Sequence, residues 1–315
     1  MSIIGIFLVA SVGTLAMGLV SSWIDRKVTA RVQYRVGPPF LQPVYDILKL
    51  LGKETLVPAR AQGRGFLLAP VVGLAAGAVA ATILWVANVM PETGFLGDLV
   101  VVLYVLTIPA IAAIYGALAS GSPHATFGAS REMKLLLSYE LPLVLAVLVP
   151  VVQMARAPEA GGASFAIGAI VGYQAAHGWV LGSLSGLIAA AVALVTMQAK
   201  LTLVPFDLPE AETELMGGSM VAYSGPPLAM IKLTRALLLA TAPVLLVTLF
   251  AGGVSDAASP MAWVAFAGKY VVVLVLVVLM RNTNPRLRID QAVRLFWFGL
   301  APLAAVALVL AWFGM

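Results

Sequence analysis

The sequence predicts an all-α polytopic membrane protein, with about eight transmembrane helices in a single integral membrane domain over residues 1–315. Composition is the first observation behind this prediction: 61% of the residues are hydrophobic and only 10% are charged, whereas about 25% are charged in soluble domains. The second is that the apolar residues form runs close to the ~20 residues that one membrane crossing needs. No internal repeat or flexible linker divides the chain.

Eight apolar runs can be delimited to within a few residues. They cover residues 3–23, 66–90, 99–118, 133–154, 179–199, 227–250, 263–280 and 295–313. An even number of crossings places both chain ends on one side of the membrane. Because no basic residue precedes the first run, we expect a retained span there and not a cleaved signal peptide.

Basic residues predict the orientation, since Lys and Arg concentrate in cytoplasmic loops. The loop after the first run contains Arg26, Lys27, Arg31, Arg35, Lys49, Lys53, Arg60 and Arg64, and further basic residues connect the last two runs. The opposite side has only Arg156 and Lys269. We therefore expect a multi-pass protein of the cell (cytoplasmic) membrane with both termini outside.

The first cytoplasmic loop, about residues 25–65, is predicted to contain an amphipathic helix over residues 42–56. Its apolar face consists of Val44, Ile47, Leu48 and Leu51, and its charged face of Asp46, Lys49 and Lys53. Such a helix lies in the plane of the membrane interface or beneath a partner protein; a helix that merely covers lipid head groups is the alternative. Gly37 and Pro38 form a rigid turn before it, together with Pro39.

A second loop, about residues 202–225, contains four closely spaced carboxylates, Asp207, Glu210, Glu212 and Glu214. No Lys or Arg lies between Lys200 and Lys232. Carboxylates that lie close together repel one another when all are ionised, so the pKa of at least one should rise toward neutrality. Such a cluster is suited to taking up and releasing protons. In a continuous helix, Asp207, Glu210 and Glu214 would share one face. Alternatively, Pro209 opens a helix and the acidic residues only favour its first turn.

Further charged residues lie within the apolar runs: Glu132 and Glu140 near the fourth, and Lys232 and Arg235 in the sixth. Charges buried in lipid are costly, so these side chains should face the bundle interior, water or one another. A structural ion pair, for instance between Glu140 and Lys232, is one interpretation. The carboxylates outnumber the intramembrane cations, however, and this excess favours a proton route from the cytoplasm.

The chain has no cysteine and only two histidines, His124 and His177, predicted on opposite sides of the membrane. Thiolate-ligated iron–sulfur clusters are therefore excluded, and we expect no cofactor or metal in this chain. The formal net charge of +5 does not indicate binding to nucleic acid, because in a membrane protein the positions of the basic residues matter more than their sum.

Several short motifs stand out: Asp25-Arg26-Lys27, Arg31-Val32-Gln33, Arg35-Val36-Gly37-Pro38, Leu41-Gln42-Pro43, Leu48-Lys49-Leu50, the 205–215 segment and Tyr223-Ser224-Gly225. Together they resemble the H-subunit family of respiratory complex I, and the resemblance extends along essentially the whole chain. Asp25 stands where that family usually has Glu, residues are missing after the Gly-Pro turn, and Ala222 replaces a Glu. The 130–134 segment, running into 138–142, is similar to the membrane subunit of energy-converting nickel–iron hydrogenases (Ech-type, carbon-monoxide-linked or formate hydrogenlyase subunit 4).

The resemblance implies a non-redox coupling subunit that links hydrogen evolution in a peripheral arm to proton or sodium translocation. Partners would hold a nickel–iron centre and iron–sulfur clusters: hydrogenase large and small subunits and a ferredoxin-like subunit, beside antiporter-like membrane subunits and the lipid bilayer. Glu140, Asp207, Glu210, Glu212 and Glu214 would carry protons, with Glu132 at the cytoplasmic mouth and Lys232 and Arg235 tuning them. Asp25, Arg26, Lys27, Arg31, Arg35, Gly37, Pro38, Lys49 and Lys53 would dock the arm.

Three other functions stay open. The first is the quinone-site member of an NADH:quinone oxidoreductase, the H-type chain of complex I itself, although Ala222 and the missing residues weaken that case. The second is a stand-alone secondary transporter, which a helix broken at Pro226 and Pro227 would suit. The third is a passive anchor for the arm, in which the carboxylates have no part in ion movement.

Overall fold

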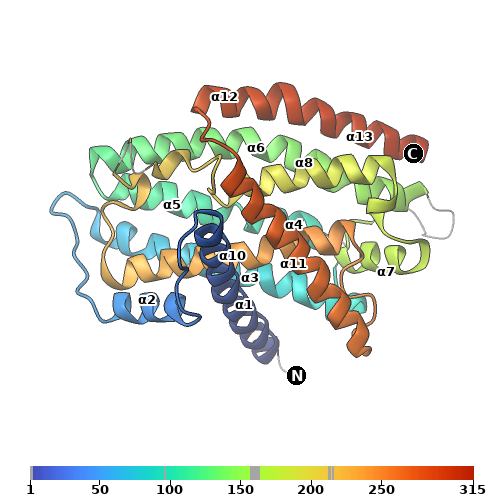
Figure 1. Ribbon diagram of the computed structural model, residues 1–315, viewed down its shortest axis with the longest axis horizontal. Coiled ribbons are helices and arrows are strands. Elements are labelled where there is room, and N and C mark those ends of the chain that lie inside the picture. Colours follow the sequence, from blue (N-terminus) through green and yellow to red (C-terminus); the bar gives the residue numbers. More distant parts are fainter. Residues whose placement is uncertain (1–2, 96, 157–163, 212–213, 215) are drawn as a thin grey trace.

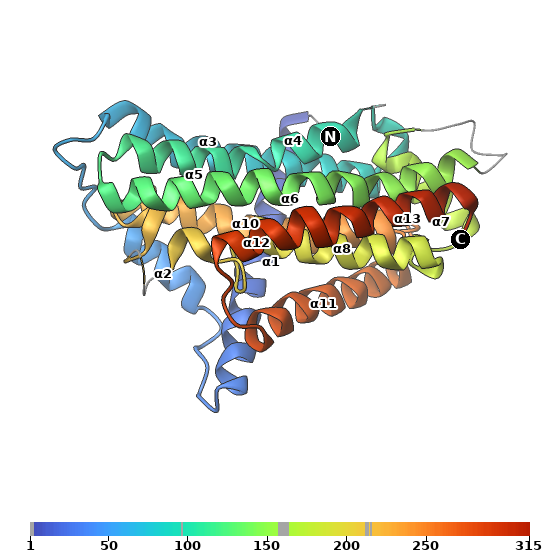
Figure 2. The same cartoon turned by 90° about the horizontal axis from the view of Figure 1, so that it is seen from above.

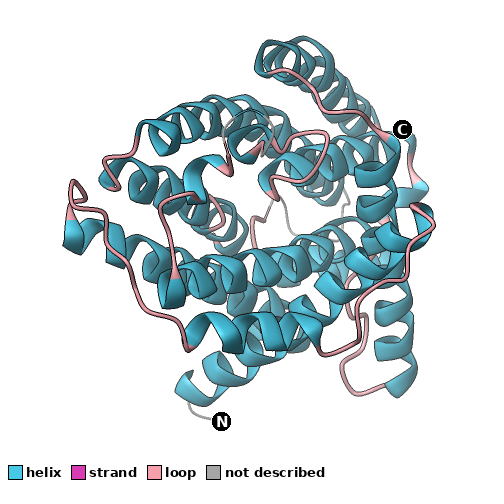
Figure 3. Cartoon of the chain, turned by 60° about the vertical axis from the view of Figure 1, so that its left-hand side comes forward, coloured by secondary structure: helices cyan, strands magenta, loops and turns pink. Residues whose placement is uncertain are grey.

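The computed structural model describes residues 3–95, 97–156, 164–211, 214 and 216–315. In that part of the chain the ordered elements are helices and short turns, without a β-strand (Figures 1 and 3). The helices are α1 (Ile3–Val32), α2 (Gln42–Leu51), α3 (Gly63–Val89), α4 (Asp98–Val105), α5 (Ile108–Ala119), α6 (Pro123–Arg156), α7 (Ile167–His177), α8 (Leu184–Lys200), α10 (Gly225–Phe250), α11 (Pro260–Thr283), α12 (Ile289–Arg294) and α13 (Ala301–Phe313). The predicted all-α class is confirmed.

Seven helical segments of the described chain are long and apolar enough to cross a membrane. They are Ile3–Val32, Gly63–Val89, Asp98–Ala119, Pro123–Arg156, Gly225–Phe250, Pro260–Thr283 and Ile289–Phe313. The eighth predicted span, 179–199, corresponds to α8, which has 17 residues. It is shorter because Val180–Gly182 forms a separate 3-10 turn and the Ser183 side chain caps the helix by accepting a hydrogen bond from the Gly186 amide.

Helix ends differ most from the prediction on the side of the first loop. Helix α1 continues to Val32 instead of residue 23, and α6 begins at Pro123 instead of residue 133. Hydropathy detects only the apolar part of a helix, so polar extensions beyond it are missed. Helix α2 ends at Leu51, before Gly52, instead of at residue 56, and the short α7 was not predicted.

Helix α10 lies at the centre of the bundle. In its most apolar stretch of 18 residues, 83% of the residues are buried, compared with 11% in the corresponding stretch of α1 and 28% in those of α11 and of the C-terminal segment Ile289–Phe313. A helix that is apolar on every side is suited to such a position. Most helices run along the long axis of the molecule, whereas α1 and α11 cross the bundle obliquely (Figures 1 and 2).

The close crossing of α1 and α10 depends on Gly18. A Cβ added at this position would collide with the backbone of Ala236 in α10. We expect Gly18→Ala to destabilise the protein by about 1–3 kcal/mol, because the clash involves backbone that cannot move away as a side chain can. The readout is the thermal unfolding midpoint of the purified complex. Gly13→Ala in the same helix is the matched control, since no atom lies within 4 Å of its added Cβ; equal midpoints for the two variants would contradict the prediction.

Candidate functional site

The carboxylate segment does not form the continuous helix that would align its acidic side chains. In the described part of this segment, a 3-10 turn, η3 (Leu208–Glu210), is followed by a second turn, η4 (Gly218–Met220). Gly128 of α6 allows the segment to pack closely, because a Cβ there would collide with the Ser219 amide and the Pro209 carbonyl. Glu212 lies outside the described residues.

Each of the other three carboxylates of the segment forms an ion pair with a cation from a different part of the chain. Asp207 pairs with Arg286 (Oδ2–Nη2 2.5 Å), and Glu214 pairs with Arg131 of α6 (Oε2–Nη1 2.5 Å). Glu210 pairs with Arg235 of α10. No Lys or Arg is close to this segment in the sequence, but the fold brings three arginines next to its carboxylates. Side-chain exposure rises from 14% at Asp207 and 16% at Glu210 to 58% at Glu214.

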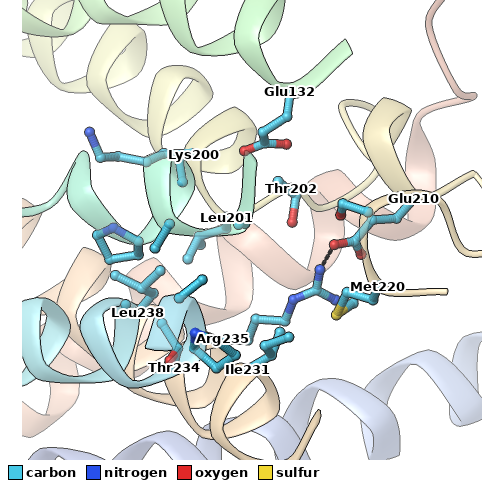
Figure 4. Close-up of a pocket in the computed structure, with 18 of the residues that line it drawn as sticks. Glu132, Lys200, Leu201, Thr202, Glu210, Met220, Ile231, Thr234, Arg235 and Leu238 are labelled. Carbon is cyan, nitrogen blue, oxygen red and sulfur yellow. Dashed lines mark ion pairs between the residues drawn. The ribbon is translucent and has the colours of Figure 1, made fainter. Parts of the chain in front are cut away.

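Behind Glu210 lies a cavity of about 80 Å³, here named the carboxylate cavity. Glu132 from α6, Glu210 from η3 and Arg235 from α10 supply charged groups to its wall, together with the side-chain stem of Lys200 (Figure 4). Small and apolar residues of α3 and α5 close the other side. Figure 4 shows the Glu210–Arg235 pair facing the cavity, while the Lys200 amine points away from Arg235.

Glu132 is only 5% exposed, and within the described chain it forms no ion pair and no hydrogen bond. Arg235 is the cation whose charge acts on it. Most buried carboxylates are paired, because an unpaired buried charge is expensive. A carboxyl group that lines a cavity without a fixed partner is free to exchange a proton with water in that cavity.

Glu140, eight residues further along α6, pairs with Lys200 of α8 (Oε2–Nζ 3.3 Å) and not with Lys232. The Lys200 side chain is 4% exposed, and its amine lies 5.4 Å from the centre of the Tyr139 ring. The Tyr139 hydroxyl is buried without a hydrogen-bond partner in the described structure, within electrostatic reach of both Glu132 and Glu140. Sequence reasoning missed both residues: Lys200 was interpreted only as a basic flank, although it closes an apolar run.

A second cavity, of about 270 Å³, lies between α1, α2 and α10 and is named the α1–α2 cavity. Its charged lining residues are Asp25, Arg26, Asp46, Lys232, Arg235 and Arg281. Asp25 is buried and pairs with Arg281 of α11, so it is not a surface residue. Arg235, Leu201 and Thr202 line both cavities.

The other predicted docking residues lie on or near the surface of the first loop. Arg31, Arg35, Lys49 and Lys53 are exposed. The Lys27 amine donates a hydrogen bond to the Gly37 carbonyl (3.5 Å), and the Trp23 indole donates one to the Pro38 carbonyl (3.2 Å). The Gly37–Pro38 turn is thus fastened to α1, while the exposed cations form a basic surface next to it.

Asp46 fixes α2 to α1 through Arg26 (Oδ2–Nη1 2.7 Å) and accepts a second hydrogen bond from Gln42 (2.9 Å). Burial opposes ionisation of Asp46, but these hydrogen bonds and the Arg26 charge outweigh it, so the pKa of Asp46 lies below its usual value of 3.8. A lowered pKa means that the pair stabilises α2 at neutral pH and that this contribution is lost as the pH falls through the lowered value.

We therefore expect Asp46→Asn to speed tryptic cleavage of the first loop at pH 7 by up to about fivefold, since an exposed ion pair contributes at most about 1 kcal/mol. In acid below the pKa of Asp46, cleavage by pepsin should no longer distinguish the variant from the wild type. Glu54→Gln is the control, because Glu54 is exposed and forms no ion pair in the described chain. A difference that persists in acid would contradict this assignment.

Taken together, the fold and the site define a polytopic membrane protein with a chain of charged groups leading into its helical bundle. The sequence pattern of the family described as NADH dehydrogenase matches residues 4–312, and the chain belongs to this family. It is 34% identical to the H chain of the NADH-quinone oxidoreductase of Thermomicrobium roseum, over 90% of this chain and 87% of that protein. Subunit 8 of the Thermus thermophilus enzyme is 33% identical, over 97% and 83%.

Among solved structures, a chain of the membrane-bound sulfane sulfur reductase, an archaeal respiratory membrane complex, is similar with a TM-score of 0.82 and 28% identity. The match covers 98% of this chain and 99% of that chain. The protein is thus a membrane subunit of the complex I-like type. The resemblance to the H-subunit family is confirmed, whereas the narrower assignment to the hydrogenase branch is not.

Proposed function

We propose that this protein is the coupling subunit of a respiratory complex, in which electron transfer in a peripheral arm drives proton movement through the carboxylates. The observation that supports this most directly is Glu132, which is buried at a cavity without a fixed partner in the described chain. On either side of it lie a paired carboxylate near the loop, Glu210, and a paired carboxylate deeper in the bundle, Glu140.

The proposed route begins at Glu214, which is more than half exposed, and continues to Glu210 and then to Glu132 at the carboxylate cavity. From there it passes the Tyr139 hydroxyl to the pair of Lys200 and Glu140. Arg235 holds Glu210 and places a positive charge beside Glu132, so a proton leaving either carboxyl group leaves behind a stabilised anion. Asp207, tied to Arg286, fixes the start of the segment.

Glu140 also indicates where protons leave the chain. Its side chain is 27% exposed, and Leu137 and Leu141 of the same stretch of α6 are exposed at 63% and 44%. These leucines give α6 an apolar face beside Glu140. A partly exposed glutamate at this depth is costly against lipid. We therefore place the neighbouring antiporter-like membrane subunits on this face.

The basic surface of the first loop would dock the peripheral arm. The first loop contacts the end of the carboxylate loop, since the Leu56 amide donates a hydrogen bond to the Ser224 hydroxyl, so charge changes in the arm would act on the carboxylates over a short distance. This arrangement requires the loop side to be cytoplasmic and both chain ends to lie outside, as the distribution of Lys and Arg predicts.

For the arm itself, we infer that quinone is the electron acceptor, because the curated relatives are subunits of NADH-quinone oxidoreductases. A hydrogenase arm with a nickel–iron centre and iron–sulfur clusters is the competing proposal, suggested by Ala222 and by the missing residues after the Gly-Pro turn. In neither case does this chain supply the redox group.

The test is purification of the intact complex and its reconstitution into liposomes. Quinone reduction by NADH, blocked by a quinone-site inhibitor and accompanied by proton uptake, is the expected result. Nickel equimolar with the complex, with hydrogen evolution from reduced ferredoxin, would replace quinone by the hydrogenase arm but keep the coupling role. Ion transport by this chain reconstituted alone would instead support a secondary transporter and reject the coupling role.

A further inference from the structure

A third polar cavity, of about 650 Å³, lies at the end of the bundle opposite the first loop. It is formed where α6 and α13 end, α8 begins and α7 packs beside them (right-hand end of Figure 1). Arg156, Tyr173, His177, Trp179, Gln153 and Ser183 supply its larger side chains. The volume is within the range of small-molecule sites, about 300–1,000 Å³. The carboxylate route does not reach this cavity.

Hydrogen bonds and ring contacts hold several walls of this cavity in place. The Gln153 amide donates to the hydroxyls of Ser183 (2.7 Å) and Ser185 (2.9 Å). Trp179 is covered on one face by the Lys269 amine, 4.5 Å from the ring centre, and that amine also donates to the Ala251 carbonyl (2.6 Å). A fixed wall lowers the entropy lost when a ligand binds.

The cavity is suited to an anion. Arg156 forms no ion pair within the described chain, and among the described lining residues the terminal carboxyl group of Met315, which accepts a hydrogen bond from the Ser185 hydroxyl, is the one acidic group. Its guanidinium lies over Gly314, where any side chain would collide with it. The His177 Nδ1 donates a hydrogen bond to the Tyr173 carbonyl (3.3 Å), so Nε2 is the ring nitrogen that could contact a ligand. Guanidinium groups bind phosphate through two parallel hydrogen bonds, in a bidentate geometry.

The rim of the cavity indicates the source of the phosphate. Leu184 at the start of α8 and Trp312 and Phe313 at the end of α13 are 56%, 65% and 66% exposed, next to lining residues of the cavity. Exposed tryptophan at the ends of apolar helices is typical of the membrane interface. We propose that this cavity binds a phosphate group, that of an anionic phospholipid whose acyl chains lie along the rim.

The test uses the purified complex in a neutral detergent, with thermal unfolding as the readout. Dioleoyl phosphatidylglycerol should raise the unfolding midpoint of the wild-type complex in a saturable manner. Arg156→Gln should weaken this response about tenfold, as expected for loss of one charge-assisted contact to phosphate. The response of Arg156→Lys should lie between those of the wild type and Arg156→Gln, because lysine keeps the charge but cannot form the bidentate contact.

Arg64→Gln is the matched control, since it removes the same charge from an exposed site at the opposite end of the bundle and should respond like the wild type. A saturable response to inorganic phosphate alone, lost in Arg156→Gln, would support the phosphate site with a soluble anion as its source. Equal responses of wild type and Arg156→Gln, or an equal response of the wild type to phosphatidylcholine, would overturn the proposal.

Discussion

Glu132→Gln should abolish proton translocation by the reconstituted complex while the arm still transfers electrons at a measurable rate. Glutamine has nearly the same shape as glutamate but cannot release a proton, and Glu132 has no partner in the described structure that the change would disrupt. The fold should therefore be retained. The measurement is the number of protons moved per electron, from quenching of a pH-sensitive dye in liposomes, and we expect a fall of at least about tenfold, typical for loss of a positioned proton carrier.

Glu132→Asp separates a chemical role from a structural one, because it keeps the carboxyl group and shortens the side chain. Partial recovery of translocation in this variant is expected. Glu54→Gln, which changes an exposed carboxylate of the first loop, should pump like the wild type. Normal pumping by Glu132→Gln would remove this residue from the route and with it the main support for the proposed function.

Glu140→Gln should both destabilise the protein and stop proton translocation, and a second substitution separates the two effects. The single change leaves the buried Lys200 ammonium without its carboxylate, which costs about 3–5 kcal/mol for a buried pair. Adding Lys200→Met removes the orphaned charge, so the thermal unfolding midpoint of the double variant should return close to that of the wild type. Translocation should stay absent in both.

The two measurements decide between the interpretations of this ion pair. If the pair only holds α6 against α8, the double variant will regain pumping together with stability, and the passive-anchor function will be supported. If the pair carries protons, stability returns and pumping does not. Lys200→Met alone should also lower the midpoint, because Glu140 then lacks its cation, although less strongly, since the Glu140 side chain is partly exposed.

The order and approximate positions of the long apolar helices could be predicted from the sequence because each apolar run is a local property of the chain. The polar ends of α1 and α6 could not, since hydropathy carries no information on where a helix stops outside the membrane. The short α7 was missed for the opposite reason, because 11 residues are too few to cross a bilayer.

In the candidate site, too, local sequence features could be predicted and long-range contacts could not. The four loop carboxylates and the intramembrane charges stand out in the sequence, but their partners do not. Arg131, Arg235 and Arg286 come from three distant parts of the chain, so the apparent lack of cations near Asp207, Glu210 and Glu214 was misleading. The alternative interpretation, an ion pair between Glu140 and Lys232, is wrong in its partner, because Glu140 pairs with Lys200 and Lys232 lines the α1–α2 cavity. A fold was needed to bring Lys200 beside Glu140.

Arg235 forms part of the wall of both the carboxylate cavity and the α1–α2 cavity. One delocalised charge therefore contributes to the electrostatic potential of two compartments at once. An anion bound in the α1–α2 cavity would weaken the interaction of this guanidinium with Glu210, and protonation of Glu210 would strengthen its interaction with the anion. Such thermodynamic linkage is reciprocal, so each event would alter the equilibrium constant of the other by the same factor.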